Sequence, residues 1–325
     1  MRAFAYHNYG EADQLKAVDQ PLGEPGAGKI RVKVEAVSVN ASDQEMLRGK
    51  PAYTRIWGPF RPRRHVLGSD IAGRVDKLGP DVDSFQPGQS VFGDVMESWG
   101  GFADYAVVPA AEMRAMPEGL SFADAGALPQ AACVAHQGLF AAADLQAGER
   151  VLINGAGGGA GAFAIQLAHR AGAHVTAVDH GDKAQFMAEL GAAETVDYRQ
   201  TDISQASDKF DVILDLIAVR SLLAYRRILA PGGRYILVGG AVPYMLQTLI
   251  LGSLMSLVGK RRYKILAAKT NHGLETLAEM VLKGELQVPI ARQYSLDDVP
   301  QAMAHFATGS VCGKLVLFAS PSSQT

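Results

Sequence analysis

The chain has 325 residues, of which 48% are apolar and 20% are charged, and its formal net charge is -2. This length predicts two domains, and the nearly balanced charge argues against a nucleic-acid-binding protein, which usually carries a basic excess. Only two cysteines are present, Cys133 and Cys312, so a disulfide framework and a four-cysteine zinc site are both excluded.

The sequence contains neither of the two apolar signals for export or membrane insertion. Its first residues form no apolar core of signal-peptide length. The most apolar run, residues 245–259, is too short to span a bilayer. We therefore expect a cytoplasmic protein with no integral membrane segment.

The first third of the chain has the pattern of β-strands separated by turns. Residues 29–40, KIRVKVEAVSVN, begin by alternating apolar and charged side chains, which predicts a half-buried strand. Residues 70–79 and 89–95 predict further strands, and Pro-Gly pairs at 25–26 and 87–88 mark turns. These features indicate a β-rich first domain.

The middle of the chain alternates strands and helices. RVLIN at 150–154 predicts a strand that is buried on both faces, and residues 162–172 predict a helix that ends at a glycine. Residues 174–179, 210–217 and 233–240 predict three more strands. Such alternation is typical of an α/β domain with an open, doubly wound parallel sheet.

The C-terminal part of the chain has a sequence pattern similar to that of the first domain. A helix is predicted within YSLDDVPQAMAHFATG, and GKLVLF at 313–318 predicts a final strand. We expect this strand to rejoin the first domain. The predicted division is therefore 1–122 and 271–325 for the discontinuous β-rich domain, with 123–270 for the α/β domain.

A glycine-rich loop, NGAGGGAG at 154–161, links the buried strand to the helix. Gly155, Gly158 and Gly161 are three residues apart, and Gly159 and Ala160 lie between the last two. A strand, a glycine loop, a helix and a second strand ending in an acid are the order of a dinucleotide-binding unit. The helix N-terminus offers backbone N–H groups to a pyrophosphate. A flexible linker is the alternative, but linkers are not flanked by a buried strand and an apolar helix.

Several segments together resemble the medium-chain dehydrogenase/reductase superfamily. They are GSDIAGRVDKLGPDVDSFQPGQSVFG at 68–93, ALPQAACVAHQGL at 127–139, VLINGAGGGAG at 151–161 and CGKLVLF at 312–318. The branch that the chain resembles is that of the zinc-independent, zeta-crystallin-like quinone oxidoreductases. The resemblance implies a GroES-like catalytic domain, a Rossmann domain and, usually, a homodimer.

The resemblance also predicts that no metal is bound. Zinc-dependent members have an early Cys, a Gly-His-Glu stretch and a later Cys, whereas this chain has Ser69 and Asp70 after Gly68 and no early Cys. Three protein ligands for a catalytic zinc cannot be assembled. Without a Lewis acid, the enzyme is suited to acceptors that are already electron-poor.

Three residues are candidates for the catalytic site. By the match to the branch, Asn40 is a donor toward the substrate or the ribose, and Asp43 holds the geometry or relays a proton. Tyr53 is a candidate proton donor to an enolate. Turn formation is the alternative for Asn40 and Asp43, and packing is the alternative for Tyr53.

Further residues are assigned to the cofactor by the resemblance. Val134 stands where relatives have a threonine at the nicotinamide, so that Gln130 is expected to take over part of this contact. Gly239 and Gly240 correspond to the segment under the carboxamide, and Ile217 is assigned to the cofactor as well. Lys314 is predicted to steer the phosphates or to be a solvated charge.

The choice between NADP and NAD depends on opposing signals. Asp179 ends the second strand of the unit, and an acid there normally binds the ribose 2′-OH of NAD. Lys183 and Tyr198 match positions that hold the 2′-phosphate in NADP-dependent relatives, and His180 and Arg199 are close in sequence. Asp179 either rotates away or pairs with Lys183. We predict NADP, with NAD as the alternative.

These inferences predict a zinc-independent reductase that transfers hydride from NAD(P)H to a quinone or an α,β-unsaturated carbonyl. An alcohol dehydrogenase or carbonyl reductase, and a non-catalytic NADPH-binding protein, are the alternatives. We expect a small, apolar, electron-poor substrate, no nucleic acid and a homodimer. The apolar and then basic run at 246–264 predicts a lid, a subunit contact or a membrane-surface helix.

Overall fold

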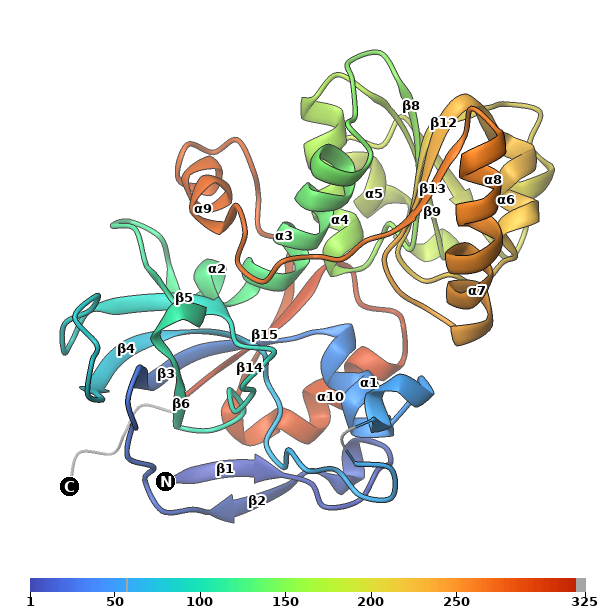
Figure 1. The fold of residues 1–325 in the computed structure, drawn as a ribbon. Helices are drawn as coiled ribbons and strands as arrows, with labels where there is room; N and C mark the ends of the chain where they lie inside the picture. Colours follow the sequence, from blue (N-terminus) through green and yellow to red (C-terminus); the bar gives the residue numbers. More distant parts are fainter. Residues whose placement is uncertain (57, 320–325) are drawn as a thin grey trace. The chain divides into compact units, whose positions relative to one another are not determined.

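The computed structural model describes residues 1–56 and 58–319. The chain forms two compact units (Figure 1). Unit 1 comprises Met1–Cys133 and Thr270–Thr325, and unit 2 comprises Val134–Lys269. The first change of unit thus falls inside α3 (Pro129–His136), later than the predicted boundary at residue 122. The helix α2 (Phe122–Ala127) stays with unit 1 because Gly126 lies directly against Ala36 of that unit.

Unit 1 is built on a β-sheet of seven strands. Its order is β14-β15-β3-β4-β5-β7, and β6 pairs with β3 outside this path. The strands are β3 (Lys29–Val39), β4 (Asp70–Leu78), β5 (Ser90–Asp94), β6 (Tyr105–Pro109), β7 (Arg114–Ala115), β14 (Ile290–Ser295) and β15 (Lys314–Phe318). A separate two-stranded sheet pairs β1 (Arg2–Ala5) with β2 (Lys16–Asp19).

The helices of unit 1 are short. Besides α2, they are α1 (Ala41–Arg48), α9 (Leu274–Leu282), α10 (Val299–Ala307) and the single turns η1 (Ala12–Gln14), η2 (Ala52–Arg55), η3 (Ala110–Glu112) and η8 (Leu296–Asp298). The apolar residues of β3 join side chains of β4, β15 and α10 in one buried core.

The last strand lies inside the sheet of unit 1. β15 pairs antiparallel with β3, with Leu315 opposite Val39, and it pairs parallel with β14 on its other side. Figure 1 shows the C-terminal segment beside the N-terminal strands of the sheet. The sheet therefore contains strands from both the first and the last part of the sequence.

Unit 2 is a doubly wound parallel sheet of six strands in the order β10-β9-β8-β11-β12-β13. The strands are β8 (Arg150–Asn154), β9 (His174–Asp179), β10 (Glu194–Asp197), β11 (Phe210–Asp215), β12 (Leu229–Leu237) and β13 (Arg262–Ile265). The strand order reverses between β8 and β11. In such sheets ligands bind at the carboxyl ends of the strands where the order reverses.

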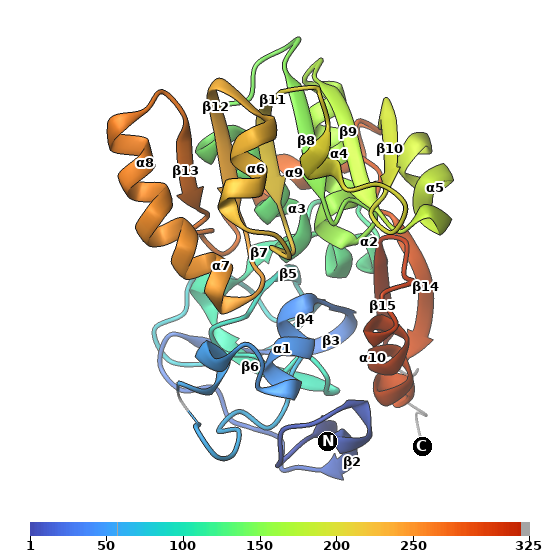
Figure 2. The ribbon, with the colours of Figure 1, turned by 90° about the vertical axis from the view of Figure 1, so that its right-hand side faces the viewer.

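Helices cover both faces of this sheet. Figures 1 and 2 show α4 (Gly159–Arg170) and α5 (Ala184–Glu189) on one face, and α6 (Leu222–Ile228), α7 (Val242–Gln247) and α8 (Ser253–Val258) on the other. The remaining helical turns are η4 (Gln137–Ala142), η5 (Gly181–Lys183), η6 (Ile203–Gln205) and η7 (Thr248–Gly252). The predicted fold class is confirmed.

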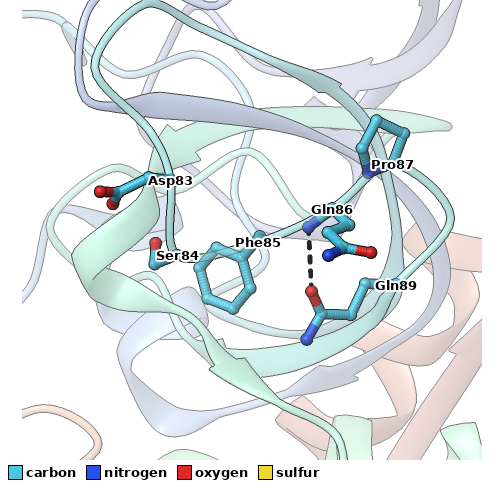
Figure 3. A pocket seen from close by; sticks show the side chains of 6 residues that line it. All are labelled: Asp83, Ser84, Phe85, Gln86, Pro87 and Gln89. Atoms are coloured by element: carbon cyan, nitrogen blue, oxygen red, sulfur yellow. Dashed lines mark hydrogen bonds between the residues drawn. The ribbon is translucent and has the colours of Figure 1, made fainter.

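Two further features concern the surface. Within residues 1–56 and 58–319, no helix is long and apolar enough to cross a membrane. The loop between β4 and β5 encloses an open depression of about 440 Å³, lined by Phe85 and the polar residues around it (Figure 3). There the Gln86 backbone N–H donates to Gln89 Oε1 at 3.0 Å. None of the predicted site residues lines this depression.

Candidate functional site

The glycine loop of unit 2 connects β8 to α4. Gly155 has φ +85°, a conformation that favours glycine. A Cβ on Gly161 would lie 2.4 Å from the Gly155 carbonyl oxygen, so the helix can approach the loop only without a side chain there. A Cβ on Gly158 would meet only that oxygen, at 3.7 Å, which leaves the loop open in front of the helix.

The first residues of α4 supply the donors for a ligand at this loop. Gly158 is the N-cap, and Gly159 and Ala160 open the helix. The first N–H groups of a helix have no partner within the helix and carry its positive dipole end. Because glycines keep this approach free of side chains, the loop fits the pyrophosphate of a dinucleotide.

The predicted adenosine-ribose corner lies at the end of β9. Asp179 Oδ2 accepts from the Gly157 N–H at 2.8 Å, and its Oδ1 accepts from the His180 N–H at 2.7 Å. The buried Lys183 ammonium lies 3.3 Å from Oδ1. Of the two predicted arrangements for Asp179, the structure has the one in which it pairs with Lys183. A Cβ on Gly157 would lie 2.4 Å from Lys183 Cδ, so that this glycine makes room for the pair.

Basic and aromatic side chains surround the Asp179–Lys183 pair. The rings of His180 and Tyr198 meet edge to face, with centroids 6.4 Å apart, and Tyr198 is 45% exposed. Arg199 Nη2 lies 3.3 Å from His180 Nδ1. The structure therefore brings Asp179, His180, Lys183 and Tyr198 together, as the cofactor prediction requires.

The turns that follow β11 and β12 pack on each other. Gly240 has φ +134°, and a Cβ there would lie 2.5 Å from the Ile217 carbonyl oxygen. A Cβ on Gly239 would meet only the Leu216 oxygen at 3.9 Å, and Ile217 itself is 42% exposed. Both turns lie at the carboxyl ends of strands, where a ligand of a doubly wound sheet binds.

A buried carboxylate that the sequence analysis did not single out holds these turns. Asp215 Oδ1 accepts from Asn154 Nδ2 at 2.7 Å and from the Ala218 N–H at 3.0 Å. Its Oδ2 accepts from the Tyr235 hydroxyl at 2.8 Å. Asp215 thus joins the end of β8 to the Ile217 turn. The signal was an acid directly after the apolar run VIL at 212–214.

In unit 1, Asn40 follows β3 and is the N-cap of α1, and Asp43 fixes it there. Asp43 Oδ2 accepts from the Asn40 backbone N–H at 2.8 Å, and Oδ1 accepts from the Gly68 N–H at 2.8 Å. Asp43 is fully buried. Its carboxylate therefore ties the start of α1 to the segment before β4. Of the two roles predicted for Asp43, this contact matches that of holding the geometry of the site.

Lys314 occupies the space beside Asn40. Its ammonium donates to Asn40 Oδ1 and, at 3.3 Å, to the Val39 carbonyl oxygen, and it lies 3.5 Å from Asp70 Oδ2. Lys314 is only 2% exposed, so it is not the predicted solvated charge. With its three donors directed at these three oxygens, this conformation does not support the predicted contact with cofactor phosphates.

Gln130 and Ser69 extend this network. Asn40 Nδ2 donates to Ser69 Oγ at 3.2 Å, and the Gln130 N–H donates to Asp70 Oδ1 at 2.9 Å. The Gln130 side chain bonds to Ser42 Oγ at 2.9 Å and reaches Asp94 Oδ2 at 3.3 Å. Gln130 is thus held by other side chains of unit 1. Val134, on α3, is the first residue of unit 2 and is partly buried.

The carboxyl groups of the network hold their protons more tightly than usual. Burial raises the pKa of Asp43 to about 7 against the opposing effect of its two backbone donors. Burial and the neighbouring Asp70 raise the pKa of Asp94 to about 8. Burial also raises the pKa of Asp70 and lowers that of Lys314, and their mutual attraction opposes both effects.

Tyr53 lies outside this network. It is on η2, and its hydroxyl donates to Glu45 Oε2 at 3.0 Å. Burial and the Glu45 carboxylate raise the pKa of Tyr53, which weakens it as an acid. The structure therefore gives no support to its predicted role as a proton donor.

Comparisons with known proteins relate this geometry to a family. The description "alcohol dehydrogenase GroES-like domain" matches residues 26–118, and "zinc-binding dehydrogenase" matches residues 190–317. A chloroplastic quinone-oxidoreductase homolog of Spinacia oleracea is 34% identical over 227 residues, which are 66% of this chain and 67% of the relative. The chain belongs to the quinone oxidoreductase branch of the medium-chain dehydrogenase/reductase superfamily.

Other members of this superfamily agree with the assignment. A chloroplastic NADPH-dependent alkenal/one oxidoreductase of Arabidopsis thaliana is 31% identical over 74% of this chain and 63% of the relative. The structure of the quinone oxidoreductase from Coxiella burnetii superposes with a TM-score of 0.87, at 27% identity, over 98% of this chain and 99% of that one. The predicted family is confirmed.

The name of the matched dehydrogenase family implies zinc, but the residues of this chain do not fit that metal. Where zinc-dependent members have Gly-His-Glu, Ser69 accepts a hydrogen bond from Asn40, and Asp70 faces the Lys314 ammonium. A divalent cation at Asp70 would be repelled by that ammonium. Among the described residues, no three His, Cys, Asp or Glu side chains form a group able to hold a metal ion.

Proposed function

We propose that the chain is an NADPH-dependent, zinc-independent reductase that transfers hydride to a quinone or an α,β-unsaturated carbonyl. The observation that carries this proposal is the open glycine loop at the switch point of the unit 2 sheet, with a basic corner at the end of the neighbouring strand. The names of the related quinone and alkenal/one oxidoreductases support the acceptor class.

The cofactor choice rests on the charges around Asp179. Its carboxylate already accepts two backbone N–H groups and pairs with Lys183, so its repulsion of a 2′-phosphate is reduced. Arg199 and Tyr198 lie at the same corner and offer donors. When bound, NADPH would supply the hydride. NAD, favoured by an unpaired acid at this position, is the alternative.

Asn40 is the residue we assign to the acceptor. Its Nδ2 carries two hydrogens, of which one reaches Ser69 Oγ. Delivery of a hydride to a quinone or an enone leaves negative charge on the carbonyl oxygen, and a preorganised N–H donor stabilises that charge. Asp43 holds the Asn40 backbone in place. The proton that completes the reduction comes from water or a nearby side chain.

A homodimer is part of the proposal. β13 is an edge strand of the unit 2 sheet, and edge strands can pair with another chain. On the adjoining helices, Leu249, Ile250, Leu254 and Leu257 are between 56% and 84% exposed. Apolar surface of this kind usually marks an interaction site. Light scattering coupled to size-exclusion chromatography gives the mass directly, and a monomer across micromolar concentrations would exclude the dimer.

One experiment separates the proposed function from its alternatives. Oxidation of NADPH and of NADH is followed side by side, with a chelator present, against an ortho-quinone and an enone. Turnover with NADPH supports the proposal, whereas turnover with NADH alone reverses the cofactor choice. Activity on alcohols or simple carbonyls that the chelator abolishes would favour the dehydrogenase alternative. Cofactor binding without turnover of any acceptor would favour a non-catalytic binding protein.

A further inference from the structure

The feature that the proposed function leaves unexplained is the ammonium of Lys314. It is fully enclosed in unit 1, yet a buried charge is costly even when it is paired. Buried ion pairs can often be replaced by apolar residues without loss of stability. Stability alone therefore does not account for a lysine at this position.

The ammonium determines how the neighbouring amide is oriented. A lysine ammonium offers only donors, so the Asn40 group that faces it must be the oxygen. The Nδ2 of Asn40 is then directed away from Lys314, toward Ser69 Oγ at 3.2 Å. If an apolar side chain replaced Lys314, this contact would no longer distinguish the oxygen of the amide from its nitrogen, and only the acceptors Ser69 and Asp70 would favour the present orientation.

Asp70 keeps the cation in place. Its Oδ2 lies 3.5 Å from the ammonium and also accepts from Ser38 Oγ at 3.3 Å, while its Oδ1 accepts from the Gln130 N–H. The other charged groups that face Lys314 are Asp43 of α1 and Asp94 of β5. Burial lowers the pKa of Lys314, and the attraction of Asp70, the largest among these carboxyl groups, opposes that effect.

We propose that Lys314, anchored by Asp70, is a positioning residue: it locks the Asn40 amide with its N–H₂ as the donor and provides a fixed positive charge behind it. This inference rests on the proposed function, in which Asn40 donates to a carbonyl oxygen that becomes negative. A cation on the amide oxygen polarises the amide and strengthens its N–H as a donor. A buried charge also acts through a lower effective dielectric than a solvated one.

The first test measures the amide itself and needs no turnover. The chain has four asparagines, Asn8, Asn40, Asn154 and Asn271, so [15N]asparagine labelling gives four side-chain amide signals, and an Asn40→Asp sample identifies the one from Asn40. We expect Lys314→Met to shift the Asn40 signal, because the charge-assisted hydrogen bond that its amide oxygen accepts is lost. The Asn154 signal, from unit 2, serves as the internal control. An unchanged Asn40 signal in Lys314→Met would overturn the inference.

The second test separates positioning from stability. Lys314→Met leaves Asp70 without its cation, so Lys314→Met/Asp70→Asn is made alongside it. We expect kcat to fall about 10- to 100-fold in both, less than for direct removal of an oxyanion donor. The dissociation constant of NADPH should change less than about twofold, because no phosphate contact is lost. Lys314→Arg should retain more activity than Lys314→Met because it keeps the charge.

The matched control is Arg234→Met, which breaks the Arg234–Glu149 ion pair of unit 2, where the guanidinium and carboxylate lie 2.7 Å apart. It should lower thermal stability and leave kcat unchanged. Wild-type kcat in the double variant, or weakened NADPH binding with kcat intact, would refute the positioning role of Lys314. If the wild-type protein reduced no acceptor, the proposed function would fail by itself, and the asparagine spectrum would still decide whether Lys314 orients the amide.

Discussion

Replacing Asp94 by Asn should flatten the dependence of the stability of unit 1 on pH. The pKa of Asp94 is raised from 3.8 to about 8 in the folded protein, chiefly by burial. Because the folded state binds this proton more tightly than the unfolded state, the stabilising contribution is complete below pH 3.8 and is lost as the pH rises toward 8. Asp94→Asn mimics the protonated group at every pH.

The magnitude follows from the linkage relation. Each pH unit between the two pKa values changes the free energy of unfolding by at most about 1.4 kcal/mol, so Asp94 alone accounts for up to about 4 kcal/mol between pH 5 and pH 8. Asp94→Asn should therefore be less stable than the wild type at pH 5. At pH 8 its free energy of unfolding should equal or exceed that of the wild type. At pH 5 the loss of a good acceptor for the Met96 N–H or for Gln130 costs about 1–3 kcal/mol.

Urea unfolding followed by tryptophan fluorescence measures this difference, because both tryptophans, Trp57 and Trp99, belong to the sequence of unit 1. The control is Asp83→Asn, at an exposed position. Its free energy of unfolding should depend on pH in the same way as that of the wild type. Equal pH slopes for wild type and Asp94→Asn would refute the assignment of a raised pKa to this carboxyl group.

Three further predictions concern unit 2. Lys183→Ala should raise the KM for NADPH about tenfold, equivalent to 1.4 kcal/mol, and spare that for NADH, while the exposed Lys209→Ala changes neither. Steady-state kinetics with both cofactors checks this, and equal effects on NADPH and NADH would contradict it. Gly161→Ala should abolish cofactor binding and cost about 1–3 kcal/mol, because its Cβ would lie 2.4 Å from the Gly155 oxygen; NADPH fluorescence titration and thermal melting measure both effects. Asp215→Asn should cost about 1–3 kcal/mol, because an amide accepts fewer hydrogen bonds than the carboxylate; a melting temperature equal to that of the wild type would count against this role.

The sequence was informative where local pattern and structure coincide. The glycine loop could be predicted because its three glycines, the buried strand and the following helix are adjacent in the chain. The need for glycine in this loop also arises from contacts within the loop and the start of the helix. Asp179 and Lys183 are four residues apart, so their pairing was one of two arrangements that could be foreseen.

The network of unit 1 could not be predicted in the same way. Lys314 begins a strand after a glycine, a position at which a lysine is usually solvated, and nothing near it in sequence indicates burial. Its contacts with Asn40 and Asp70 depend on the pairing of β15 with β3 and of β3 with β4, and this register is a property of the whole sheet. Asp94 entered the network because it lies opposite Asp70 in the β4–β5 pair.

The place of β15 has a consequence for how the protein is made. Asn40 and Lys314 are 274 positions apart, and β15 is the last strand within the described residues. On the ribosome, β3 and β4 emerge early, and unit 2, whose residues are continuous, can fold while the C-terminal strand is still in the exit tunnel. During that interval Asp70 does not have the Lys314 cation, and the part of β3 at residues 36–39 does not have its partner β15. Completion of this site therefore waits for the synthesis of β15, and a nascent chain that stops before Lys314 is expected to expose a strand edge to chaperones or to other chains.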